Sequence, residues 1–90
     1  MKKSYEDFAA SQVTVTTTAT LLAASADGRD EVTIQQLGTT AIYIGKADVT
    51  TATGFRLPGV DGASITLPAT TGIYGITASG SQAVAVLVTS

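Results

Sequence analysis

The side chains that most often carry out catalysis are scarce in this chain. It contains no His and no Cys, so the commonest general base, the commonest metal ligand and the thiol nucleophile are all missing. One acidic cluster is present, formed by Asp27, Asp30 and Glu31 with Arg29 inside it. Loop carboxylates suit a hard cation such as calcium, but this spacing does not fit an EF-hand. We interpret the cluster as a solvated turn and expect no bound metal.

Two other patterns match catalytic motifs only in part. The segment GFRLPG at 54–59 has two glycines but lacks the following Lys and Ser or Thr of a phosphate-binding loop. No Ser has a His that would activate it. We therefore expect a protein that is not an enzyme and that needs no cofactor.

Five aromatic side chains are the candidates for contact with a partner. Tyr43, Phe55 and Tyr74 have the flat faces that stack on sugars, but such residues are also common in cores and subunit interfaces. Tyr5 and Phe8 lie three residues apart, as on one face of a helical turn. Residues 1–11 are either an anchoring arm that uses these two rings or a frayed terminus.

Charge is unusually sparse, at 13% of residues, and the stretch 62–90 has none. Soluble domains spread charge over their surface, so this stretch predicts burial or contact with other chains. A chain of 90 residues without Cys has a small core and no disulfides, which leaves self-association as the usual reinforcement. We expect a homo-oligomer, and specifically a trimer.

Other partners are disfavoured by the same composition. The net charge is -2 and the five cations are scattered along the chain, which gives no basic patch for nucleic acid. No apolar run approaches the roughly 18 to 20 residues that cross a membrane. Lys2 and Lys3 are followed by Tyr5-Glu6-Asp7, so no export signal is visible.

The elements that position these residues are short strands. From Gln12 onward Val13 and Val15 alternate with threonines, which is typical of a strand. This change of pattern places a boundary between an arm, 1–11, and a β domain, 12–90. Further strands are predicted at 31–37, 41–45, 55–57, 64–67, 73–78 and 82–89.

Turn signals separate the strands. Asp27-Gly28, Gly38-Thr39-Thr40 and Ser79-Gly80-Ser81 suit tight turns. We expect 31–37 to pair with 41–45, and 73–78 with 82–89, as two hairpins. Both faces of 82–89 are apolar, so we expect that strand to be covered on both sides.

Strands at this spacing predict an all-β fold. About six to eight short strands separated by turns are typical of a single antiparallel β-sandwich or jelly-roll-like barrel, here with an N-terminal arm.

The order of segments resembles the small β-structured virion proteins of tailed bacteriophages, especially capsid decoration or cement proteins. The blocks that carry the resemblance are TIQQLGTTAIYIG at 33–45, GFRLPG at 54–59 and IYGITASG at 73–80. The resemblance implies a sandwich or jelly roll without catalysis, bound in many copies to major capsid protein or another virion protein. Its location would be the capsid surface, after synthesis in the host cytoplasm.

A different class of function stays open. The same fold would serve a glycan-binding or adhesin-type module of a tail, fibre or head surface, using exposed Tyr43 and Tyr74 with loop residues. The chain has no Trp, the aromatic residue with the largest stacking face, which weighs against this alternative.

Overall fold

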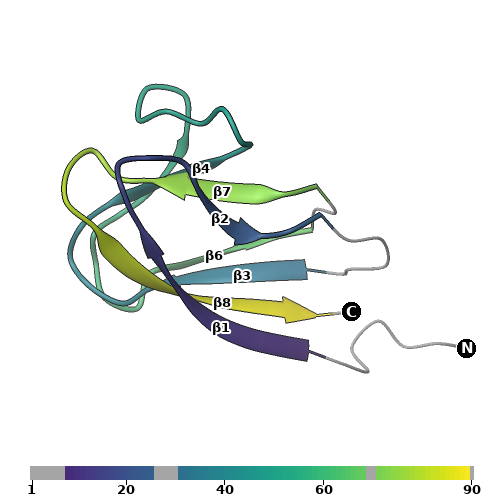
Figure 1. The fold of residues 1–90 in the computed structure, drawn as a ribbon. Helices are drawn as coiled ribbons and strands as arrows, with labels where there is room; N and C mark the ends of the chain where they lie inside the picture. The colour runs from purple at the N-terminus through teal and green to yellow at the C-terminus, as the bar shows by residue number, and fades with distance from the viewer. Residues whose placement is uncertain (1–7, 26–30, 69–70, 90) are drawn as a thin grey trace, which may run out of the picture.

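The chain forms two antiparallel β-sheets that pack face to face (Figure 1). The computed structural model describes residues 8–25, 31–68 and 71–89. Each sheet has four strands, and no helix occurs within these ranges. The predicted all-β sandwich is therefore confirmed. The strands are β1 (Phe8–Val15), β2 (Thr20–Ala23), β3 (Glu31–Gln36), β4 (Ile42–Gly45), β5 (Phe55–Leu57), β6 (Ser64–Leu67), β7 (Ile73–Ile76) and β8 (Gln82–Thr89).

The strand order is that of a jelly roll. One sheet has the order β1-β8-β3-β6 and the other β2-β7-β4-β5. The strands thus pair as 1 with 8, 2 with 7, 3 with 6 and 4 with 5, as if one long antiparallel ribbon had been rolled up. Except for β4 and β5, strands adjacent in sequence lie in different sheets.

This topology corrects both predicted hairpins. β3 pairs with β6 and β8, whereas β4 pairs with β5 and β7, so the two strands belong to different sheets. β7 and β8 are likewise in different sheets. The predictions were wrong because a short glycine turn serves equally well to fold a hairpin within one sheet and to carry the chain from one sheet to the other.

The turn before β8 has the predicted backbone nevertheless. Gly80 has a φ of 66°, in the left-handed region that favours glycine. The Thr77 hydroxyl donates a hydrogen bond to the Gly80 carbonyl over 2.9 Å. The residue types therefore identified the turn correctly, while the partner of each flanking strand was fixed by the core.

The first strand begins earlier than expected. β1 starts at Phe8, which pairs with Thr89 of β8, and not at Gln12. The predicted arm 1–11 thus gives four of its residues to the sheet, and Phe8 is part of a strand instead of a helical turn. Tyr5 and the Asp27-Gly28 turn lie outside the described residues, so the predictions about them stay open.

The same strand also ends sooner than its alternating pattern suggests. β1 stops at Val15, and the chain turns before β2. The Thr20 hydroxyl donates to the Thr18 carbonyl over 2.8 Å, and the Thr18 amide donates to the Thr16 hydroxyl over 3.3 Å. Threonine hydroxyls that bond nearby backbone compete with the strand ladder, and here they stabilise a turn between the sheets.

The core lies between the two sheets and is aliphatic. Most inward-facing β-branched side chains of both sheets are buried, as the alternating pattern predicts. The members with no exposed surface are Val15, Val32, Ile34, Ile42 and Val84.

Two buried amides fix the connection between β3 and β4 at one end of the core. Gln36 Nε2 donates to the Thr40 carbonyl over 2.7 Å, and the Thr40 amide donates to Gln82 Oε1 over 3.0 Å. Gly59 packs against the same connection so closely that a Cβ there would collide with the Thr39 backbone. This end of the sandwich is therefore held by specific contacts between distant parts of the chain.

Candidate interaction surface

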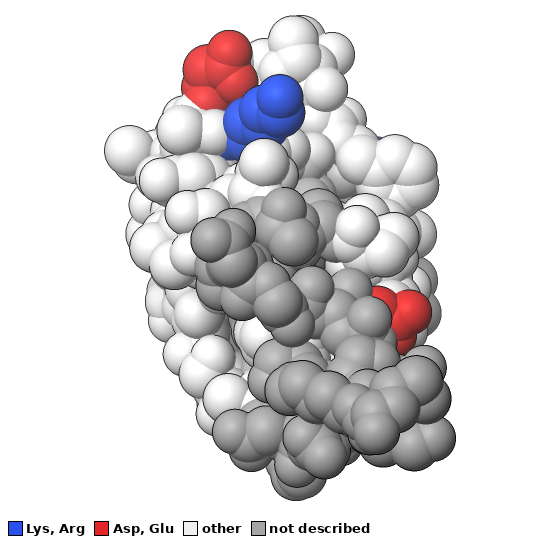
Figure 2. Space-filling view, turned by 90° about the vertical axis from the view of Figure 1, so that its right-hand side faces the viewer, with Lys and Arg blue, Asp and Glu red and all other residues white. Residues whose placement is uncertain are grey.

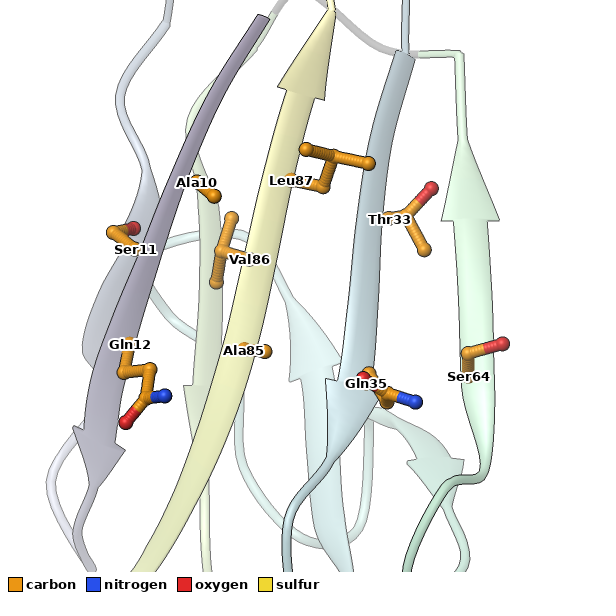
Figure 3. Close-up of a pocket in the computed structure, with 9 residues that line it drawn as sticks. All are labelled: Ala10, Ser11, Gln12, Thr33, Gln35, Ser64, Ala85, Val86 and Leu87. Atoms are coloured by element: carbon orange, nitrogen blue, oxygen red, sulfur yellow. The ribbon is translucent and has the colours of Figure 1, made fainter.

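The outer side of the β1-β8-β3-β6 sheet presents two rows of side chains that cross all four strands. The register aligns Ala10 with Leu87, Thr33 and Thr66, and aligns Gln12 with Ala85, Gln35 and Ser64. Figure 3 shows these side chains on the four strands, apart from Thr66. We call this surface the uncharged face; its residues are Ala10, Gln12, Thr33, Gln35, Ser64, Thr66, Ala85 and Leu87.

Charge is almost excluded from this sheet. Among the described residues, Glu31 at the start of β3 is the one charged residue in any of its strands. Figure 2 views the end of the sandwich at which β1 and β3 begin and β8 ends. Most of the described surface there is uncharged, with charged atoms in a few small patches. Exposed sheets usually carry several charges that keep them from associating, whereas the described strands of this one carry Glu31 alone, at one end of the sheet.

The uncharged face is shallow and hollowed. Small side chains, including Ala10, Ala85 and Ser64, lie among the longer Gln12 and Gln35, and a depression of about 430 Å³ lies along these strands. Its walls come from four strands of a hydrogen-bonded sheet, so its shape is set by backbone rather than by mobile loops. A surface of this form fits another flat or gently convex surface better than it fits a small ligand.

Hydrogen-bonding capacity on this face is available to a partner. Thr33 and Thr66 share a hydrogen bond of 2.9 Å between their hydroxyls. The amide groups of Gln12 and Gln35 are exposed and have no hydrogen-bond partner within the described part of the chain. Each amide offers two donor hydrogens and an acceptor oxygen, so the face can form polar contacts without burying a charge.

Strand β8 is covered on one side only within this chain. Val84 and Val86 face the core and are buried, as expected, but Leu87 on the other side is 38% exposed. The prediction of cover on both sides is therefore not met by the single chain. The apolar second side of β8 was the sequence signal for this surface; Gln12, Gln35 and Ser64 gave none, because their position beside β8 depends on pairing between distant segments.

The predicted aromatic residues do not form one platform. Tyr43 and Tyr74 are half-buried on the outer side of the β2-β7-β4-β5 sheet, where Tyr43 pairs with Ile76, and Tyr74 with Leu21. Phe55 pairs with Ile44, which faces the core, so Phe55 also points to the core side of that sheet, opposite to the two tyrosines. Two of the three rings share a face, and the third lies at the edge of the sandwich.

Tyr74 borders a second depression, of about 410 Å³, on the outer side of its sheet. Leu21, Ser25 and Lys46 also line it. It combines one aromatic ring with polar and cationic groups, in contrast to the uncharged face on the other sheet.

The two glycines of segment 54–59 allow the chain to pack closely against neighbouring parts of the fold. A Cβ on Gly54 would lie 2.7 Å from Cβ of Tyr43, so this glycine lets the loop approach β4. The segment supplies β5 and the close approach of Gly59 to the backbone of Thr39.

Metal ligation finds no support in the part of the chain that the structure describes, where no three acidic, His or Cys side chains gather. Asp27 and Asp30 lie outside that part, so their interpretation as a solvated turn remains a prediction. No helix among the described residues is long and apolar enough to cross a membrane.

Comparisons with protein families, with curated proteins and with solved structures gave no match. The fold defines the class, a small jelly-roll sandwich, and its function has to be inferred from its own surfaces.

Proposed function

We propose that this chain is a non-enzymatic structural protein of a tailed-bacteriophage virion, which decorates and stabilises the capsid as a homo-oligomer. The observation that carries the proposal is the uncharged face, a rigid sheet surface that a single chain leaves uncovered. Major capsid protein subunits are the proposed partner at this face.

The size of the face favours a contact that is repeated many times. Four strands about 4.8 Å apart span about 19 Å, and the two rows occupy about 14 Å along the strands, which gives a projected area of roughly 270 Å². A stable one-to-one complex buries about 800 Å² of accessible surface per partner. A modest interface becomes effective when a symmetric oligomer binds a repeating shell through several copies.

The resemblance to decoration proteins agrees with this role. Its three blocks correspond to β3 with β4, to β5 with its following turn, and to β7 with the turn before β8. These blocks build the scaffold and contribute few residues to the uncharged face. The chain also has no His and no Cys, which supports a role in assembly rather than in catalysis.

The test is the composition of the virion. Quantitative mass spectrometry of purified particles, compared with infected-cell lysate, should find this chain in a fixed ratio to the major capsid protein. Presence in the lysate but not in washed particles would refute a structural role.

A glycan-binding module is the second candidate, favoured by one observation. Tyr43 and Tyr74 share an outer face, and Tyr74 borders a depression that also contains Ser25 and Lys46. Aromatic faces stack on sugar rings. Binding on a glycan array that is lost in Tyr74→Ala but retained in Ala85→Lys would support this function over capsid decoration.

A further inference from the structure

The sandwich is open along one edge, between strands β5 and β6. Each is the last strand of its sheet and is hydrogen-bonded to one neighbour, β4 or β3 respectively. A cleft of about 330 Å³ lies there. The inward-facing side chains that line it are Ile44, Phe55, Ile65, Leu67 and Ile73.

Phe55 in this cleft is 64% exposed although it points to the core side of its sheet. Ile65 and Leu67 on the facing strand are half-buried. Aliphatic and aromatic groups on the inner side of a sandwich are normally covered, so a cleft walled by them suits an apolar side chain from outside the described fold. Lys46 stands at its rim and forms no ion pair with the acids that the structure describes.

We infer that this cleft binds the N-terminal segment of a second copy of the chain, with the Tyr5 side chain between β5 and β6. The segment that precedes β1 reads MKKSYED, so an aromatic residue is followed directly by two acids. The ring matches the apolar walls, and Glu6 and Asp7 complement Lys46 at the rim. The inference rests on the proposed self-association and names the surface that would mediate it.

The geometry favours a second copy over the chain's own segment. Tyr5 precedes Phe8 by three residues, so its Cα reaches at most about 11 Å from the start of β1. β1 and β6 are the two outer strands of one sheet, three strand spacings or about 14 Å apart. The cleft lies between the sheets on the inner side of β6, where Ile44 and Ile73 of the facing sheet also line it. A chain's own Tyr5 would have to cross the end of its sheet with a fully extended backbone to approach it, whereas the segment of a second copy can enter from the open edge.

A contact from the start of β1 to the β5–β6 edge of the next copy is head-to-tail. Such a contact forms a ring when the rotation between copies closes, which agrees with the expected trimer. It also covers the free edges of β5 and β6, which would otherwise be open to uncontrolled strand pairing. The uncharged face is not used and stays available for the capsid.

Disulfide cross-linking gives a direct test, because the chain has no Cys. Chains with Glu6→Cys are mixed with mass-tagged chains with Lys46→Cys under oxidising conditions, and Thr51→Cys replaces Lys46→Cys as the control. Thr51 is exposed in the loop that follows Lys46 and does not line the cleft. Efficient cross-linking between chains at Lys46 and not at Thr51 is expected.

Cross-linking no better than the Thr51 control would overturn the inference. A chain with both Glu6→Cys and Lys46→Cys that closes its disulfide internally would overturn it as well, since the segment would then occupy its own cleft. Neither result affects the mass-spectrometry test on purified virions. Failure of the inference about the cleft can therefore be distinguished from failure of the proposed function.

A second measurement uses affinity. Tyr5→Ser should raise the dissociation constant of the oligomer by about 10- to 100-fold in analytical ultracentrifugation, the effect of losing one buried aromatic side chain. Ser4→Ala should leave it unchanged. Lys46→Glu should weaken association, and Glu6→Lys with Asp7→Lys in the same chain should restore it; no effect of Tyr5→Ser would contradict the inference.

Discussion

Replacing Ala85 with Lys places a charge at the centre of the uncharged face. Ala85 lies on β8, between Gln12 on β1 and Gln35 on β3, and its side chain points away from the core. The lysine stem can lie along the sheet with its ammonium group in water. The free energy of unfolding should therefore change by no more than about 0.5 kcal/mol.

Binding to the capsid should respond strongly to the same change. If the face is covered, the ammonium group must be desolvated without an acidic partner, at a cost of about 3 to 5 kcal/mol. The lower value corresponds to a binding constant reduced by about 100-fold, because each 1.4 kcal/mol is a factor of ten. Ala85→Lys should thus fold normally and fail to bind.

The assay is co-sedimentation with undecorated particles, alongside thermal melting followed by circular dichroism. Thr51→Lys makes the same charge change at an exposed loop position away from the face and should bind as the unmodified chain does. The reasoning is refuted if Ala85→Lys binds within about threefold of the unmodified chain while both variants melt normally.

Three further predictions concern the fold. Ile34→Ala, which empties a fully buried site, should reduce the free energy of unfolding by about 2 to 5 kcal/mol in denaturant titration. Gly80→Ala should cost about 1 to 2 kcal/mol through its positive φ, and Gly59→Ala should cost more, because the new methyl group collides with the Thr39 backbone; equal melting temperatures for the two would contradict this ranking. A chelator should leave the melting temperature unchanged, since the acids around Asp27 are interpreted as a solvated turn, and a drop of more than about 5 °C would indicate a bound cation.

Local patterns were sufficient to find every strand except β2 (Thr20–Ala23), which was not separated from the strand before it, and most of the turns. The alternation of aliphatic with polar residues located β3 and β6, and the alternation of Val with Ala and Leu located β8, each to within a residue or two, because burial of one face requires a period of two. Gly80 marked its turn because few other residues tolerate a positive φ.

Partner choice was not predictable from the same patterns. β8 pairs with β1 and β3 rather than with β7. The period-two pattern of a strand shows which side is buried, but it does not determine which other strand forms hydrogen bonds with it. The start of β1 was missed for a related reason: Phe8–Ser11 lack a clear alternation, and their place in the sheet comes from pairing with β8.

The candidate surface was partly foreseen. The absence of charge from Gly62 onward and the apolar second side of β8 predicted a contact surface there. That Gln12, Gln35 and Ser64 complete it depends on the jelly-roll topology, which brings segments from both halves of the chain into one sheet.

A cryo-electron microscopy map of the native particle tests the central claim most directly. The account predicts copies of this sandwich at repeating positions on the shell, with the outer side of the β1-β8-β3-β6 sheet against capsid protein. A shell that lacks this density, or one on which the Tyr43 and Tyr74 side of the sandwich makes the contact, would contradict it.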